Sequence, residues 1–176
     1  MRLLDSQSKR HLGEKLACGV CISFAFSTLA GAAERLDDSA SPRAAVEAQI
    51  VLGDQGRPLA DALNPRMAIV KFGRIDYKLA TSRYVGHQVR IYLVVPPTVP
   101  GLRSPAGLRV AWRGDGRFAG GTARAGERRL VWAGSVDAAW MTEALELEWQ
   151  VDLNQMEWQR GGRVALETYF EIEVAR

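Results

Sequence analysis

A two-residue alternation near the C-terminus limits the fold of this chain more than any other feature. It runs from Ala165 to Val174, with Glu167, Tyr169, Glu171 and Glu173 on one side and Leu166, Thr168, Phe170, Ile172 and Val174 on the other. A strand directs successive side chains to opposite faces, whereas a helix would scatter these glutamates around its circumference. The pattern therefore predicts a strand over 165–174 with one apolar face and one acidic face.

The rest of the chain repeats this signal in short runs. Residues 145–151 alternate in the same way, and further strands are predicted at 46–52, 67–72, 74–80, 88–95, 108–112 and 128–133. The runs on either side of Gly73 are two strands or one strand with a bulge. Seven or eight short strands separated by Gly/Pro turns, without a strand–helix rhythm, predict an all-β, immunoglobulin-like antiparallel sandwich in one domain over 45–176.

The N-terminus has the composition of a secretory signal. A basic leader precedes the apolar run 16–30, which is followed by small residues at 31–33. The apolar run is shorter than the ~20 residues that a membrane-spanning helix needs. We therefore expect residues 1–32 to be a cleaved signal peptide and 33–44 a flexible tail. The mature chain is expected in the periplasm, on the cell surface or in a fimbrium, without a transmembrane segment.

Cleavage changes the chemistry of the chain. Both cysteines, Cys18 and Cys21, lie in the leader, as do four of the 23 basic and two of the 20 acidic residues. The remainder has 19 basic against 18 acidic residues, a net charge of +1. So small a charge gives no reason to expect nucleic acid as a partner.

Reactive side chains are few. The mature chain has a single histidine, His87, and although Ser82 and Asp76 complete a triad on paper, no G-x-S-x-G elbow supports it. The carboxylates that could act in pairs fall on predicted solvent faces: Glu146, Glu148, Glu167, Glu171 and Glu173. We therefore predict that the protein is not an enzyme and has no catalytic residue, metal site or cofactor.

The charge pattern also predicts how the strands are distributed. Glutamates occupy the outer faces of 145–151 and 165–174, and like charges directly opposite each other destabilise a sheet. We expect these two acidic strands to lie in different sheets, each beside an arginine-bearing neighbour.

Aromatic and arginine residues give two candidate surfaces. Trp112, Trp132 and Trp149 are in phase with apolar neighbours and are predicted to lie between the sheets, whereas Trp140 and Trp158 fall outside clean strand patterns. The latter two form either a partner surface or a short amphipathic helix. Around the glycine-rich loop 114–126, arginines that include Arg117 and Arg124 form either an anion-binding surface or a solvated rim.

Three segments together resemble subunits of the alternate chaperone–usher pathway, the colonisation-factor type of fimbriae. They are 46–52 with the turn 53–59; the strands 89–93 and 108–112 with a proline-bearing loop between them; and the closing run 168–174. The resemblance implies a sandwich that lacks one strand, which an N-terminal extension of the next subunit supplies, with a periplasmic chaperone and an usher as partners.

By this resemblance, the donor-strand residues would be Val46, Ala48, Ile50 and Leu52. The same alternation suits the first strand of the chain's own sandwich, and this alternative stays open. The leading hypothesis is a structural fimbria-like subunit. The alternative is a self-contained periplasmic binding or accessory domain for a protein or an anionic ligand.

Overall fold

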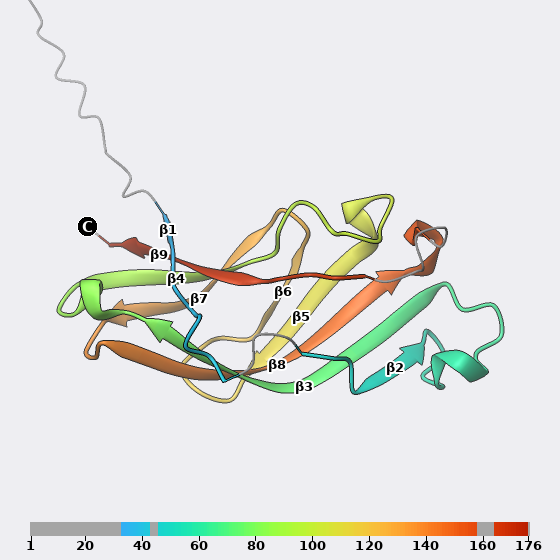
Figure 1. Cartoon of the computed structure of the whole chain (residues 1–176), viewed down its shortest axis with the longest axis horizontal. Helices are drawn as coiled ribbons and strands as arrows, with labels where there is room; N and C mark the ends of the chain where they lie inside the picture. The colour runs from blue at the N-terminus through green and yellow to red at the C-terminus, as the bar shows by residue number, and fades with distance from the viewer. Residues whose placement is uncertain (1–32, 43–45, 158–163, 176) are drawn as a thin grey trace, which may run out of the picture. The chain divides into compact units, whose positions relative to one another are not determined.

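Two antiparallel sheets face each other in the computed structural model, which describes residues 33–42, 46–157 and 164–175 (Figure 1). The four-stranded sheet has the order β1-β9-β4-β7: Glu34–Arg35, Tyr169–Val174, Gln88–Val94 and Arg128–Ser135. The five-stranded sheet has the order β2-β3-β8-β5-β6: Ile50–Gly53, Met67–Ala80, Trp140–Asp152, Leu108–Gly114 and Gly121–Arg124. The predicted antiparallel β-sandwich is confirmed.

The connections contain short 3-10 turns and, within the described residues, no α-helix. These turns are η1 (Leu59–Asp61), η2 (Ser82–Tyr84), η3 (Pro105–Gly107) and η4 (Leu153–Gln155). Gly73, at φ 71°, lies in the bulge where the β3–β8 register shifts, so the two predicted runs form one long strand.

The core lies between the sheets and follows the predicted alternation. Ile91, Leu93 and Phe170 of the four-stranded sheet and Val110 and Leu145 of the five-stranded sheet are almost fully buried. Of the three tryptophans expected between the sheets, Trp112 is buried, whereas Trp132 and Trp149 are partly exposed.

The two acidic strands lie in different sheets, as predicted. In β8, Glu146 is directly opposite Arg113 of β5, and their side chains form an ion pair at 3.0 Å. In β9, Glu173 is opposite Arg90 of β4. Each acidic strand therefore has an arginine-bearing neighbour, which avoids a row of facing glutamates.

Several strand boundaries differ from the prediction. The described residues form nine strands rather than seven or eight, because β1 lies in the expected tail and β6 in the expected glycine-rich loop. Strand β8 begins at Trp140, so this residue is neither in a helix nor in a loop. Strand β9 begins only at Tyr169, and residues 165–168 are not part of a ladder.

The expected tail lies against the sandwich instead. Strand β1 pairs with β9, and Leu36 is 3% exposed and belongs to the core. Further along, the Asp37 carbonyl accepts a hydrogen bond from Ala80 N at 2.9 Å, so the segment passes from one sheet to the other. One buried leucine and long-range hydrogen bonds hold a segment whose composition is typical of a mobile terminus.

Candidate functional site

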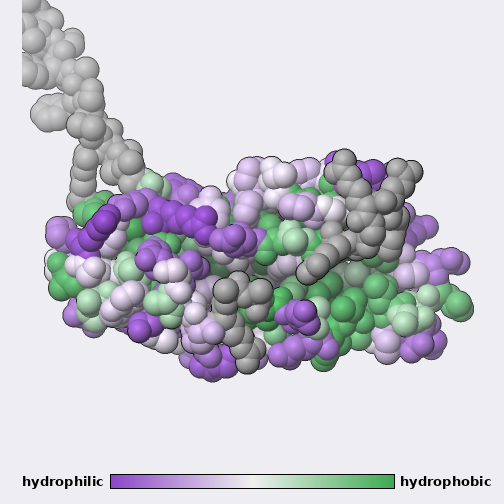
Figure 2. Space-filling model, in the orientation of Figure 1, coloured by the Kyte–Doolittle hydropathy of each residue, from purple (hydrophilic) through white to green (hydrophobic). Residues whose placement is uncertain are grey.

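An apolar groove lies between the two sheets, at the edge where β1 and β9 lie over β2 and β3. It has a volume of about 1200 Å³. On the face shown in Figure 2, hydrophobic side chains are visible between β9 and β3, with hydrophilic residues on either side. We refer to it below as the β9 groove.

The floor of the β9 groove comes from the inner face of the five-stranded sheet. Strand β3 contributes Val70 and Phe72, and β8 contributes Leu147 and Trp149. The rings of Phe72 and Trp149 lie 4.5 Å apart between centroids. These side chains are in phase on their strands, so the alternation that builds the core also builds the floor.

One lip of the groove is the segment 164–168, directly before β9. Val164, Leu166 and Thr168 are partly buried and alternate with exposed Ala165 and Glu167, so the burial pattern of a strand continues beyond the ladder. All five residues line the groove. The sequence predicts a strand here, and the structure provides no strand to pair with it among the described residues.

The backbone of this lip has one edge covered and one edge facing the groove. Ala165 N donates to Pro100 O at 3.3 Å on one side, whereas Phe170 O accepts from Leu36 N at 2.8 Å on the side of β1. Because a strand alternates the direction of its backbone groups, those of Leu166 and Thr168 are expected on the β1 side. Beyond Leu36 no strand covers that side in the described part of the chain.

Tyr77 and Thr168 mark the end of the groove nearest β1. Burial raises the pKa of the Tyr77 hydroxyl, and a hydrogen bond with the Thr168 side chain opposes that rise. The Tyr77 ring meets Phe170 edge-on at 5.0 Å. At this end of the groove, the Tyr77 hydroxyl therefore has a hydrogen-bond partner and the Tyr77 ring is packed against Phe170.

Trp149 lies further along the floor and has an unsatisfied donor. Its Nε1 is the one buried side-chain nitrogen or oxygen without a hydrogen-bond partner in the part of the chain that the structure describes. An indole N–H buried in this way is unusual, since buried polar groups are nearly always paired.

Ionic contacts hold β1 at the same edge. Glu34 accepts hydrogen bonds from Arg83 at 3.0 Å and from the Tyr84 hydroxyl at 2.7 Å. Burial, followed by the Glu34 hydrogen bond, raises the pKa of Tyr84 to about 12. Arg35 forms an ion pair with Glu167 on the lip of the groove.

The alternation predicted that the four donor-strand candidates share one face, and this prediction is wrong. Val46 and Ala48 line the β9 groove, but Val51 does so in place of Ile50 and Leu52. Ile50 and Leu52 pair with Lys71 and Ile69 in the β2–β3 ladder, and Ile50 is 50% exposed.

The change of phase occurs at Gln49, next to the β3 bulge. Gln49 N donates to Lys71 O, and the Gln49 amide covers Gly73, where a Cβ would lie 2.6 Å from its oxygen. In this chain, residues 50–53 thus form an edge strand of its own sandwich.

Comparison with known proteins does not assign this chain to a family. No family model, no curated protein and no solved structure matches the chain. The β9 groove and the residues around it are therefore the features from which a function can be inferred.

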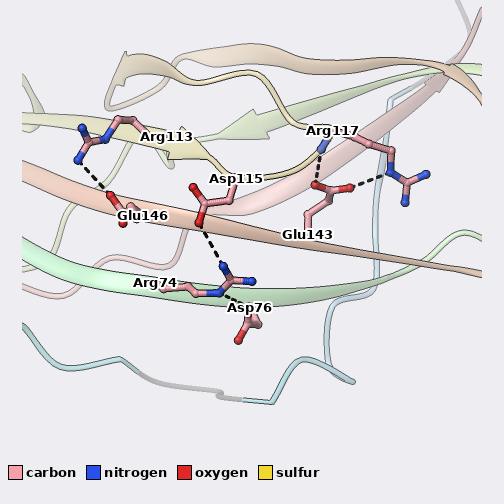
Figure 3. Close-up of polar contacts among 7 residues, drawn as sticks. All are labelled: Arg74, Asp76, Arg113, Asp115, Arg117, Glu143 and Glu146. Carbon is pink, nitrogen blue, oxygen red and sulfur yellow. Dashed lines mark hydrogen bonds and ion pairs between the residues drawn. The ribbon is translucent and has the colours of Figure 1, made fainter.

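A second, polar cluster lies on the five-stranded sheet, beneath the loop between β5 and β6 (Figure 3). The buried Glu143 carboxylate accepts hydrogen bonds from Arg117 N and Arg117 Nε, both at 2.9 Å. Asp115 in the same loop pairs with Arg74 at 3.1 Å, and Arg74 also pairs with Asp76. Opposite charges meet throughout, so the cluster fastens the loop to the sheet.

The proposed partner-surface residues have intrachain contacts of their own. Arg117 pairs with Glu143 and Asp137, and Arg124 N donates to Glu127. Trp140 is 45% exposed and lies under the Lys78 ammonium, 4.8 Å from the ring centroid. Trp158 is outside the described residues, as is the expected leader at 1–32.

The residues considered for catalysis lie in three elements: Asp76 in β3, Ser82 in η2 and His87 in the turn before β4. Asp76 pairs with Arg74 on β3, whereas His87 lies exposed in the turn before β4. Among the described residues, no group of three or more His, Cys, Asp or Glu side chains could hold a metal ion. Within the same residues, no helix is long and apolar enough to span a bilayer.

Proposed function

We propose that this chain is a non-enzymatic structural subunit of an extracytoplasmic, fimbria-like assembly, in which an extended strand from a neighbouring subunit fills the β9 groove. The observation that carries the proposal is the lip at 164–168. It continues the sequence and burial pattern of a strand along an apolar groove, yet no strand lies beside it among the described residues.

The chemistry of the groove fits a peptide strand. An added strand would pair with the backbone of 164–168, and its alternate side chains would pack on Val70, Phe72 and Trp149. This division of labour, with main-chain hydrogen bonds for affinity and side-chain pockets for selectivity, is the usual one in β-strand addition. The expected leader supports export, and a periplasmic chaperone and an usher are the proposed assembly partners.

Residues 46–52 are the donor segment in this proposal, and they must then leave their own sandwich. The β2–β3 ladder that holds them covers only the four residues Ile50–Gly53, at the end of the sheet. A ladder this short at an edge opens at low cost compared with the core strands.

The test is binding of a synthetic peptide with the sequence of residues 44–54 to the full chain. We expect a rise in the melting temperature and saturable binding by fluorescence anisotropy. The same peptide with Ile50→Asp is the control and should bind at least tenfold more weakly, because it places a carboxylate in an apolar groove.

A pair of protein variants locates the site. Leu166→Asp changes the lip of the groove and should weaken binding of the parent peptide at least tenfold. Leu130→Asp changes a leucine that is 50% exposed on β7, at the opposite edge, and should leave binding unchanged. Equal binding by both variants, or no binding by the wild-type chain, would contradict the proposal.

A further inference from the structure

The segment 46–53 changes its phase halfway along. Val46 and Ala48 line the β9 groove, and the next residue that lines it is Val51, at an interval of three instead of two. Ile50, which a regular alternation would place inward with them, is 50% exposed. On its own sandwich, the segment is therefore not docked in the phase that its sequence prescribes.

The cause of this phase change is the bulge in the neighbouring strand β3. The groove-lining residues of β3 also include an interval of three, from Phe72 to Ile75 across Gly73. Gln49 lies at the same place: its N donates to Lys71 O at 2.8 Å, and its side-chain amide occupies the space that a Cβ at Gly73 would take. The segment thus takes over the bulged phase of the edge on which it lies.

The lip at 164–168 offers a strand an edge without such a bulge. Its partly buried residues recur at a regular interval of two, at Val164, Leu166 and Thr168, and the range contains no glycine. A strand that pairs with a regular edge keeps a single phase, because each residue pair turns the side chains to the opposite face. Docked on the lip, the donor would therefore place all four of its alternating apolar residues inward.

We infer that the donor segment has two docked states of different phase: on its own sandwich Val51 faces the groove, and in the groove of a neighbouring copy Ile50 and Leu52 face it instead. The first state is autoinhibitory, because Val46 packs against the core in the groove that a neighbour's strand would fill. The inference rests on the proposed function, since it takes 46–52 as the donor.

The two states differ in how much apolar surface they bury. On the chain's own sandwich, Ile50 is 50% exposed and Val51 is 36% exposed, and Ala48 is exposed as well. In the regular phase, Ile50 and Leu52 would both lie against the apolar floor, and burial of aliphatic side chains favours that state. A single subunit thus covers part of its own groove with a weakly held segment, which exchange replaces with a strand that buries more.

The experiment places the same substitution in the chain and in the 44–54 peptide. In the full chain, Val51→Asp should release the segment and lower the Kd of the parent peptide by about threefold or more, because a larger fraction of the chain has an open groove. Leu130→Asp, at the opposite edge, is the control and should leave this Kd unchanged. In the peptide, Val51→Asp should keep the Kd within about twofold of the parent, whereas Ile50→Asp should raise it at least tenfold.

Hydrogen exchange of the Gln49 amide tests the same displacement in the wild-type chain. Its bond to Lys71 O should slow exchange while the segment is docked on β3. Saturation of the ¹⁵N-labelled chain with unlabelled parent peptide should remove this protection, because the chain's own segment has to leave the groove. The measurement needs no substitution, so it decides the question even if the Val51→Asp chain does not fold.

The possible failures are distinguishable. If the parent peptide does not bind the wild-type chain, or binds Leu166→Asp equally well, the proposed function fails together with the inference. If the parent peptide binds at the lip but the Gln49 amide stays protected, the two strands do not compete and the inference alone is overturned. The same holds if Val51→Asp weakens the peptide as much as Ile50→Asp does, because the bound strand would then have no regular phase.

Discussion

One long edge of the sandwich is closed by the chain's own loop, whereas the other edge is open at the β9 groove. At the β6–β7 edge, the loop 115–120 folds over the core, Phe118 is 2% exposed, and Ala119 N donates to Val131 O at 2.8 Å. Trp112 Nε1 donates to Ala119 O at 3.0 Å, and Glu143 anchors Arg117. At the β1–β2 edge the sheets are joined by residues 36–41 and then separate into the β9 groove.

The difference lies in which polar groups are satisfied from within the chain. At the closed edge the Trp112 indole has its own acceptor, whereas at the open edge the Trp149 indole has none among the described residues. Two tryptophans with the same sequence signal thus differ in whether the described chain supplies an acceptor for the indole N–H. One edge is completed by the chain's own loop, and the other is the edge at which we propose that a partner strand binds.

The largest expected effect comes from removing a phenylalanine at each edge. Phe118→Ala at the closed edge should lower the free energy of unfolding by about 3–5 kcal/mol, because it leaves an enclosed cavity beside Phe170. Phe72→Ala should cost at least about 1 kcal/mol less, because its space opens into the groove. Urea denaturation measures both values, and equal losses would mean that the two edges are packed alike.

The second-largest expected effect concerns the Arg117–Glu143 ion pair, which holds the loop at the closed edge. In Arg117→Gln the buried Glu143 carboxylate loses a charged donor, which should cost about 1–3 kcal/mol of unfolding free energy. Arg113→Gln is the matched control: its pair with Glu146 is exposed, and such pairs contribute about 0–1 kcal/mol. If the control variant is the less stable of the two, the loop does not depend on Glu143.

The smallest effect is at the open edge and depends on pH. The pKa of Tyr84 is raised from its ordinary 10.0 to about 12, so this hydroxyl stabilises the fold fully below pH 10, and its contribution is lost as the pH rises toward 12. At pH 8, Tyr84→Phe should cost no more than about 1 kcal/mol. Unfolding free energies of both proteins measured between pH 8 and 12 should converge, and a constant difference would contradict the role of the Glu34–Tyr84 hydrogen bond.

Sequence reasoning predicted the sheets because their signals are local. The alternation in 145–151 and 166–174 fixes which side chains face inward, and the glutamates place these strands in different sheets. It missed β1 because Leu36 is a lone apolar residue among polar ones, held by contacts with residues far along the chain.

The groove could not be predicted for a related reason. It arises where the two sheets separate, which depends on how far each strand continues to pair. Nothing in 165–168 distinguishes it from the paired residues that follow, and the phase change at Gln49 depends on the bulge at Gly73, on another strand. The alternation over 165–168 predicted a strand there, but not that its edge would be left without a neighbour.

The pairing of β1 with β9 also determines when folding can finish. The strand that starts the described chain and the strand that ends it are neighbours in one ladder, so that ladder closes only after Val174 has left the ribosome or, in an exported chain, the translocation channel. Until then, apolar β4 lacks the neighbour that separates it from β1, and its edge is open to other chains. A newly delivered molecule is therefore most vulnerable to misassembly just before β9 arrives.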